Sequence, residues 1–154
     1  PDRSWPAHGA TTHLSILMLD LDHFKNVNDH FGHPAGDAVL RHIASLMVQS
    51  VRSTDLLARW GGEEFVVLLP NTDAPSALVL ADKLRLKPAG TPTIWKPDHT
   101  PIPIALTTSI GLSSLQPGHT ASMAELDALR SQADQALYAA KHAGRNRVVV
   151  ADPN

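Results

Sequence analysis

The stretch RWGGEEFVVLLP, residues 59–70, places two glycines and two carboxylates directly before a strongly apolar run. The apolar run predicts a buried strand, and the residues just before the glycines predict another. Gly61 and Gly62 are then expected to form a two-residue hairpin turn, because glycine adopts the backbone angles of such turns without strain. Glu63 and Glu64 would lie beside the tip of this hairpin, on opposite faces of the second strand.

Apolar patterns in the rest of the chain predict an alternation of strands and helices. Continuous apolar runs indicate strands, and apolar residues at helical spacing indicate helices. On this basis we expect further strands at 15–22, 104–115 and 147–151, and helices at 37–52, 73–87 and 121–142. The polar segment 23–36 is assigned no element, and the proline-rich segment 88–103 is expected to be a loop or a short irregular hairpin.

The predicted order of elements is strand, helix, hairpin, helix, strand, helix, strand. This is the split βαβ, or ferredoxin-like, pattern with an addition at its end. We therefore expect an α+β domain in which helices flank a central antiparallel sheet. Residues 14–152 would form this single domain, and residues 1–13, which have no hydrophobic period, would be a flexible leading segment or linker remnant.

The composition indicates a folded domain and argues against several classes of function. Of the 154 residues, 43% are hydrophobic and 18% are charged, as in globular proteins. A net charge of -2 argues against a partner that is a nucleic acid polymer, which normally needs a basic surface. No apolar stretch approaches the roughly 20 residues that span a bilayer, so no membrane contact is expected. The chain lacks cysteine, which fits the cytoplasm, including the cytoplasmic part of a larger sensor protein.

A cluster of carboxylates is predicted where two strands meet. In the ferredoxin-like pattern the first strand lies beside the third, so Asp20 would end near Glu63. Neighbouring carboxylates repel each other unless a positive charge lies between them, and Mg²⁺ or Mn²⁺ is the natural ion for such oxygen ligands. A metal held in this way on a small open sheet is an arrangement for phosphoryl transfer. Taken alone, the GGEE sequence fits equally well a solvated hairpin tip whose glutamates only maintain solubility.

Four separated motifs occur in the order and spacing of one enzyme family. They are DLDHFKNVND (20–29), HPAGD (33–37), RWGGEEF (59–65) and YAAKHAGRN (138–146). Together they resemble the GGDEF family of bacterial diguanylate cyclases, over about residues 14–150. The resemblance implies a palm-like variant of the ferredoxin fold and the condensation of two GTP molecules into cyclic di-GMP, with release of two pyrophosphates. The chain departs from the family before the first strand, where a DxLTxLxNR-like segment is usual.

The resemblance also implies a metal site. Asp20 and Glu63 match the family's metal-binding carboxylates, and the main-chain carbonyl of Leu21 completes the site. Glu63 matches as well the position expected to help to deprotonate the ribose 3′-hydroxyl, although a bound metal would itself make that proton easier to lose. Glu64 is expected to be a supporting ligand or to orient the other ligands.

Contacts with the substrate follow from the same resemblance. Asn28 and Asp37 match the guanine-binding positions, and a carboxylate suits guanine because it can accept two N–H bonds from the edge of the base. The alternative role for Asp37 is as the N-cap of the helix predicted to begin there. Contacts with the phosphates are expected from the loop after the first strand and from the end of the last helix, through Phe24, Lys25, Lys141 and Arg145. Cations at a helix end would also complement the helix dipole without any ligand.

The RSTD motif that begins at Arg52 matches the family's inhibitory site, where the product cyclic di-GMP binds. Arg52 can fork onto a phosphate or a guanine edge, and Asp55 can accept guanine N–H groups. Arg59 is expected to help to hold the product there. A further cation from the next helix is usual in the family, and the candidates here are Lys83 and Arg85. The competing interpretation of RSTD is a charged turn between a helix and a strand.

The implied reaction requires two copies of the domain. Each GTP supplies its 3′-hydroxyl to the α-phosphate of the other, so two sites must face each other across a two-fold axis. We therefore expect a homodimer during catalysis, and an upstream sensor or regulatory domain that controls how the two copies meet. Two alternatives stay open at this point: a receptor for GTP or cyclic di-GMP without turnover, and a different palm-type nucleotidyltransferase.

Overall fold

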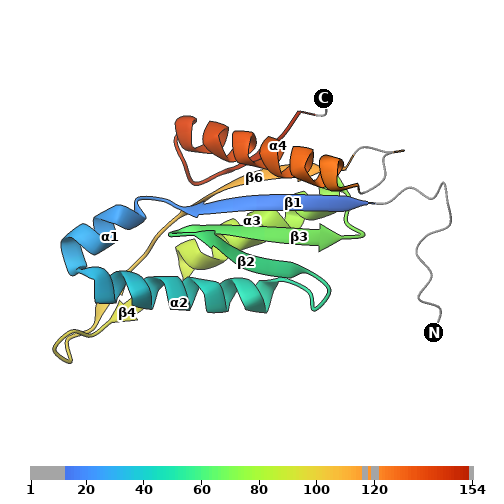
Figure 1. The fold of residues 1–154 in the computed structure, drawn as a ribbon. Helices are drawn as coiled ribbons and strands as arrows, with labels where there is room; N and C mark the ends of the chain where they lie inside the picture. Colours follow the sequence, from blue (N-terminus) through green and yellow to red (C-terminus); the bar gives the residue numbers. More distant parts are fainter. Residues whose placement is uncertain (1–12, 116–117, 119–121, 153–154) are drawn as a thin grey trace.

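A five-stranded sheet packed between helices forms the part of the chain that the structure describes, residues 13–115, 118 and 122–152 (Figure 1). The structure is a computed structural model. Its elements in chain order are β1 (Leu14–Leu21), α1 (Phe24–Phe31), α2 (His33–Ser50), β2 (Leu56–Gly61), β3 (Glu64–Pro70), α3 (Ala74–Gly90), β4 (Thr93–Trp95), β5 (Ile102–Ile104), β6 (Thr108–Ser114), α4 (Met123–His142) and β7 (Val148–Val150).

The strand order in the sheet is β2-β3-β1-β6-β7. β1 runs antiparallel to both of its neighbours, β3 and β6, and β2 runs antiparallel to β3. These four strands have the ferredoxin-like arrangement, and the predicted α+β class is confirmed. The added strand β7 pairs parallel with β6, because α4 carries the chain back along the sheet before β7 begins. The sheet is therefore mixed, with antiparallel pairing at its centre.

The two faces of the sheet carry separate hydrophobic layers. Leu17 and Leu19 of β1 point to the side of α2 and α3, where the larger core lies. Ile16 and Met18 point to the other side, where they pack against α4. Figure 1 shows α4 on one side of β1 and α2 on the other. This alternation follows the two-residue period of a strand, and it sends the side chain of Asp20 to the α4 side.

Gly111 in β6 lets α4 approach the sheet closely. A Cβ atom at this position would lie 2.0 Å from the carbonyl oxygen of Ala133 and 2.3 Å from the amide nitrogen of Leu137, so no side chain fits there. Two residues further along, the hydroxyl of Ser113 donates a hydrogen bond of 2.6 Å to the carbonyl oxygen of Leu129. The glycine therefore serves a close approach of main chains. The contact fixes α4 across the sheet and so positions its last turn.

The structure corrects the prediction for the polar segment after β1. Helix α1 occupies most of this segment, for which the sequence pattern predicts no element. Phe24 and Val27 are its buried residues, spaced three apart, and the other positions are polar or only partly buried. A helix of eight residues gives too short a pattern to be recognised, and it is stabilised here by packing against α2.

Helix α2 begins at His33, four residues before its predicted start at Asp37. Its N-cap is Gly32, which has no side chain to mark the boundary in the sequence, and Pro34 lies in the first turn. Asp37 therefore lies inside the helix, and its alternative role as an N-cap is wrong. Its carboxylate is exposed and is available for another contact.

The proline-rich segment forms the short hairpin that was one of the two expectations for it. β4 pairs antiparallel with β5, and the pair forms a separate two-stranded sheet. Helix α3 continues past Pro88 to Gly90, three residues beyond its predicted end. Within the described ranges, no helix is both long and apolar enough to cross a membrane.

Candidate active site

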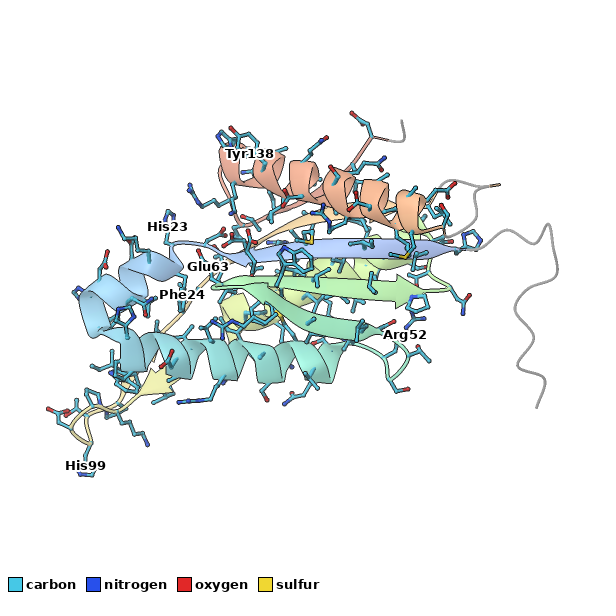
Figure 2. All side chains as sticks on the ribbon, viewed as in Figure 1. His23, Phe24, Arg52, Glu63, His99 and Tyr138 are labelled. Carbon is cyan, nitrogen blue, oxygen red and sulfur yellow. The ribbon has the colours of Figure 1, made fainter. Side chains whose placement is uncertain are left out.

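β1 and β3 bring the predicted carboxylates together at one end of the sheet. Asp20 lies directly opposite Glu64 in the antiparallel register. The main-chain N–H of Leu21 donates a hydrogen bond of 3.2 Å to the carbonyl oxygen of Glu63. The predicted proximity of Asp20 and Glu63 is therefore confirmed. Figure 2 shows Glu63 near the start of α1, where Phe24 lies.

The turn that carries Glu63 differs from the predicted one. Gly61 still pairs with Glu64, so the two residues at the tip are Gly62 and Glu63. A register shift before Gly61 marks a β-bulge at Trp60, and this extra residue moves the turn by one position. Neither Gly61 nor Gly62 has a positive φ, so the conformational freedom of glycine is not what this turn needs. A Cβ atom on either would meet nothing within 4 Å, and the space around the tip is open.

Asp20 is a buried carboxylate with a cation beside it. Only 5% of the residue is exposed, and its Oδ2 atom accepts a hydrogen bond from the ammonium group of Lys141 at the end of α4. The pKa of Asp20 is raised to about 6, chiefly by burial; Lys141 acts in the opposite direction, and the charges of Glu63 and Glu64 add to the rise. Burial outweighs the ion pair, so Asp20 exchanges its proton close to neutral pH.

The carboxylates at this end of the sheet are oxygen donors of the kind that Mg²⁺ and Mn²⁺ prefer. In the described part of the chain, however, no three histidine, aspartate or glutamate side chains converge closely enough to hold a metal ion. The ammonium group of Lys141 instead lies against Asp20. The donor set fits a divalent metal in its chemistry, and Lys141 lies at only one of the two carboxylate oxygens of Asp20, Oδ2.

Asp22 is a second buried carboxylate at the end of β1, beside Asp20, and the sequence pattern assigns it no role. Its buried carboxylate accepts hydrogen bonds from the hydroxyls of Thr107 (2.7 Å) and Ser109 (2.6 Å) and from the main-chain N–H of Asn146 (3.0 Å). These contacts join the end of β1 to β6 and to the loop after α4, which contains a predicted phosphate-binding arginine. The signal was present in the sequence, because a second carboxylate two residues after Asp20 in an apolar run needs buried partners.

Phe24 and Lys25 lie in the first turn of α1, not in a loop as predicted. The first N–H groups of a helix have no partner within the helix, so they stay suited to phosphate oxygens. His23 precedes them with φ 57°, a left-handed conformation that turns the chain from β1 into the helix. The Lys25 side chain is 87% exposed and lies 4.0 Å from Asp29, an exposed pair too weak to fix its ammonium group.

The end of α4 forms a Schellman motif that sets the position of Arg145. The N–H of Arg145 donates to the carbonyl oxygen of Ala140 at 3.0 Å, and the N–H of Gly144 donates to that of Lys141 at 3.4 Å. Gly144 has φ 121°, a value that favours glycine at this place. Lys141 and Arg145 therefore belong to one tight turn, and the ion pair of Lys141 with Asp20 holds that turn at the carboxylate end of the sheet.

A cavity of about 450 Å³ brings together five of the residues predicted for metal and substrate binding. They are Phe24, Lys25, Asn28, Asp37 and Glu63, and the lining is completed by His33, Leu40, Arg59 and Gly62. Asn28 is seated against α2, since a Cβ atom at Gly36 would lie only 1.8 Å from its Oδ1 atom. The volume is in the range of small-molecule sites, and the polar groups converge from α1, α2 and the β2–β3 hairpin.

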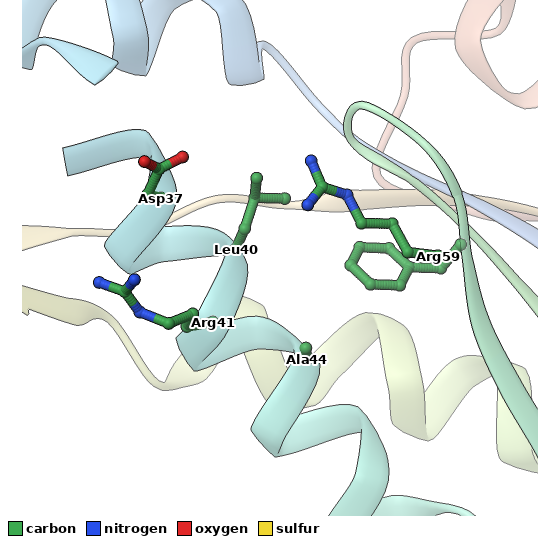
Figure 3. Close-up of a pocket in the computed structure, with 6 residues that line it drawn as sticks. Asp37, Leu40, Arg41, Ala44 and Arg59 are labelled. Atoms are coloured by element: carbon green, nitrogen blue, oxygen red, sulfur yellow. The ribbon is translucent and has the colours of Figure 1, made fainter. Parts of the chain in front are cut away.

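A second cavity, of about 320 Å³, adjoins the first and shares Asp37, Leu40 and Arg59 with it. Figure 3 shows Arg59 extending from the hairpin towards α2, opposite Asp37 and Leu40. The Nε atom of Arg59 donates a hydrogen bond of 2.8 Å to the carbonyl oxygen of Gly62. Arg59 therefore lines both cavities, and its expected part in binding the product stays a prediction.

Arg52 and Asp55 form a closely bonded pair just before the start of β2, at the end of the strand that is distant from the hairpin tip. The guanidinium group of Arg52 donates to Oδ1 of Asp55 at 2.8 Å, to the carbonyl oxygen of Pro70 at 3.1 Å and to the hydroxyl of Thr72 at 2.5 Å. The hydrogen bond to Asp55 raises the pKa of Arg52 above its usual value. The Asp55 side chain is 0% exposed and that of Arg52 is 54% exposed. The pair thus stabilises the turn, while one side of the arginine still faces solvent.

The two candidate cations on α3 have different surroundings. Lys83 is exposed. Arg85 donates to Oδ1 of Asp82 at 2.9 Å and to Oδ1 of Asn146 at 3.0 Å, and so ties α3 to the loop after α4. Of the two, Lys83 is the one whose side chain is open to solvent, and its part in the inhibitory site stays a prediction.

Comparison with known proteins identifies the family. The chain matches the family model described as diguanylate cyclase, GGDEF domain, over residues 2–147. Diguanylate cyclase DgcP of Pseudomonas aeruginosa is 44% identical over 138 residues, which are 90% of this chain. Diguanylate cyclase A of Treponema denticola is 40% identical over 141 residues, which are 92% of this chain. The chain spans only 19% and 36% of the lengths of these two relatives.

Solved structures show the same fold. The GGDEF domain of DgcB from Caulobacter crescentus in complex with c-di-GMP has a TM-score of 0.79 at 34% identity, with 90% of this chain and 78% of that chain covered. The active GGEEF domain of a diguanylate cyclase from Vibrio cholerae has a TM-score of 0.78 at 34% identity, with 92% and 85% covered. From the family match and these relatives together, we conclude that the chain belongs to the GGDEF domain family.

Proposed function

We propose that this domain condenses two GTP molecules into cyclic di-GMP. In each half of the reaction the 3′-oxygen of one GTP bonds to the α-phosphorus of the other, and the bond from that phosphorus to the β-phosphate oxygen breaks, which releases pyrophosphate. The observation that carries the proposal is the cavity whose lining combines Asn28 and Asp37 with Lys25 and Glu63. It offers polar contacts for a base on one side, and for a phosphate chain and a reacting hydroxyl on the other.

The nucleotide is held at both of its ends in this proposal. Asp37 accepts hydrogen bonds from N1–H and the 2-amino group of guanine, a pair that adenine does not offer. Asn28, seated against α2, contacts the neighbouring edge of the base. The first N–H groups of α1 and the ammonium group of Lys25 bind the phosphates from one side, and Lys141 and Arg145 bind them from the other.

Asp20, Glu63 and the carbonyl oxygen of Leu21 would hold a divalent cation, Mg²⁺ or Mn²⁺, with Glu64 in support. When bound, such an ion supplies positive charge to the triphosphate and lowers the pKa of the attacking hydroxyl. Glu63, at the tip of the hairpin, accepts the proton of the 3′-hydroxyl. Lys141 leaves Asp20 and turns to the phosphates, so its charge stays within the site.

The reaction needs two copies of the domain related by a two-fold axis, because each site supplies only one of the two nucleotides. The open space around Gly61 and Gly62 supports an approach of the second copy to the hairpin tip. Any upstream sensor or regulatory domain would act by changing how the two copies meet, since this changes the distance between the reacting atoms without altering either site.

Product inhibition at the RSTD motif is the second part of the proposal. Arg52 turns one side to solvent and is held in place by Asp55 and Thr72, which suits a preorganised contact with a phosphate or a guanine edge. Lys83 adds positive charge from α3, and Arg59, which lies in β2, also lines the substrate cavity. Binding of cyclic di-GMP there would slow the enzyme when the product accumulates.

One assay tests the proposed function. The purified domain, fused to a dimeric coiled coil, is incubated with GTP and Mg²⁺, and the products are separated by chromatography. We expect cyclic di-GMP with two pyrophosphates for each cyclic product. Tight binding of cyclic di-GMP without any turnover would assign the domain to receptors, and a linear dinucleotide product would indicate a different nucleotidyltransferase.

A further inference from the structure

The smaller cavity shares Asp37, Leu40 and Arg59 with the substrate cavity. Further along α2 it is lined by Arg41 and Ala44 (Figure 3). Leu40 and Phe65 are buried and supply apolar surface, and Ala44 keeps the slot open because its side chain is small. Asp37 and Arg41 are exposed and lie one helical turn apart on the same helix. A slot with apolar walls and charged groups at its rim fits a flat heteroaromatic base whose edge is polar.

Asp37 and Arg41 have opposite hydrogen-bonding characters, and the side chain of each is available for a ligand. An ionised carboxylate only accepts hydrogen bonds, and a guanidinium group only donates them. Within the described ranges, neither side chain has a hydrogen-bond or ion-pair partner, although the two are close enough in sequence for a pair to form along the helix. An acceptor and a donor that face the same slot without meeting are a suitable arrangement for a ligand that carries both kinds of group.

Guanine carries its polar groups in a fixed order around the ring. The 2-amino group and N1–H are donors, and O6 and N7, which follow next, are acceptors. If Asp37 accepts from the two donors, O6 and N7 still need a donor on the far side of the base. Asn28 lies against Gly36, on the N-terminal side of Asp37, and Arg41 lies on its C-terminal side. Arginine is the commonest partner of O6 and N7, through two parallel N–H groups.

We propose that Arg41 is a specificity-determining residue that donates to O6 and N7 of the guanine held by Asp37. Four residues of helix separate them by about 6 Å along the axis. Side chains on a helix lean towards its N-terminus, which brings the guanidinium group back towards Asp37. The inference rests on the proposed function, since it takes guanine as the base in this cavity.

Equilibrium binding of three nucleotides tests the inference without any need for turnover. GTP offers every contact, 7-deaza-GTP lacks the N7 acceptor, and ITP lacks the 2-amino group. We expect the unaltered chain to bind GTP about 3- to 10-fold more tightly than 7-deaza-GTP. Arg41→Met should bring this ratio close to one and leave the ratio of GTP to ITP unchanged. Lys87→Met, which removes an exposed cation from α3, is the matched control and should leave all three affinities unchanged.

The possible results separate the roles of the residues. Equal weakening of all three nucleotides by Arg41→Met would show a general effect of charge or folding, and would overturn the inference. A ratio that changes in Arg59→Met but not in Arg41→Met would assign the contact to Arg59, and would also overturn it. Both of these results leave the proposed function intact. Absence of GTP binding by the unaltered chain would remove the proposed function itself.

Discussion

Lys141, in the last turn of α4, donates a hydrogen bond to the buried carboxylate of Asp20 at the end of β1. The two residues are 121 positions apart in the sequence, and they meet because Gly111 allows α4 to lie close against the sheet. The ammonium group offsets part of the buried negative charge. It lies at one of the two carboxylate oxygens, so it would compete with the proposed divalent cation for Asp20.

Lys141→Met should therefore change the affinities for metal and for nucleotide in opposite directions. At pH 8 and without nucleotide, we expect Mn²⁺ to bind about tenfold more tightly to the variant. This factor corresponds to about 1.4 kcal/mol, which is close to the lower limit for a hydrogen bond to a charged group. GTP should bind more weakly, because a phosphate contact is lost. Electron paramagnetic resonance of free Mn²⁺ measures the first effect. Mn²⁺ affinity that stays equal or falls would show that the two cations do not compete.

Asp20→Asn should stabilise the domain at alkaline pH when metal and nucleotide are absent. The pKa of Asp20 is raised from 3.8 to about 6, so its ionisation costs stability as the pH rises through about 6, and the neutral form carries no such cost. Asparagine cannot ionise. We expect the variant to be more stable by up to about 3 kcal/mol at pH 8, and the difference to shrink towards zero near pH 4.

Urea denaturation at the two pH values measures this difference in the free energy of unfolding. The lost hydrogen bond from Lys141 opposes the gain and makes about 3 kcal/mol an upper value. A variant that is less stable than the unaltered domain at pH 8 would mean that the ion pair, not burial, dominates the energy of Asp20.

Glu63→Gln should strongly reduce turnover and leave the fold intact. The residue lies in the turn between β2 and β3, so the loss of its charge should not disturb the core. We expect the rate to fall by about 10²- to 10⁴-fold, the usual contribution of a general base. Circular dichroism and binding of GTP without metal are the controls. Turnover at the unaltered rate would remove Glu63 from its proposed role.

Gly111→Ala should destabilise the domain strongly. The added methyl group would meet the main chain of α4 at 2.0 and 2.3 Å, and neither Ala133 nor Leu137 can move without displacing the helix. We expect a loss of about 2–4 kcal/mol in the free energy of unfolding, as for other overpacked cores. Gly90→Ala is the matched control. A Cβ atom there meets nothing within 4 Å, so that variant should be neutral or slightly stabilised.

Arg52→Ala should relieve inhibition by cyclic di-GMP and lower the melting temperature. Both effects are expected because Arg52 faces solvent on one side and bonds Asp55 and Thr72 on the other. Thr72→Val separates the two effects, because it removes a hydrogen bond that holds Arg52 in place but leaves the positive charge of Arg52 present. Inhibition curves measured at several product concentrations decide the result. An unchanged curve in Arg52→Ala would reduce RSTD to a stabilising turn.

Hydrophobic periodicity is sufficient to predict most of this fold. β1 and β3 are short apolar runs typical of buried strands, and the order of elements then indicates the ferredoxin-like arrangement. The periodicity does not indicate α1, which is too short and too polar. It also misplaces the start of α2, because its N-cap, Gly32, has no side chain to signal it. The displaced turn depends on a bulge at Trp60, which tertiary pairing determines and local sequence does not.

The parts of the candidate site that depend on strand order can be predicted from the sequence. The parts that depend on side-chain contacts between distant residues cannot. Asp20 and Glu63 come together because β1 pairs with β3, which the pattern of elements implies. The partners of Asp22 lie 85 to 124 positions away, and no local pattern announces them. Likewise, the ion pair of Lys141 with Asp20 requires the full packing of α4 on the sheet.

β2 forms one edge of the sheet, and the bulge at Trp60 interrupts its pairing just before the turn. A regular open edge invites a strand of another molecule to add to it, which leads to aggregation. A bulge twists the edge out of line and prevents such growth. The bulge at Trp60 therefore disfavours the addition of a strand from a second molecule at this end of β2.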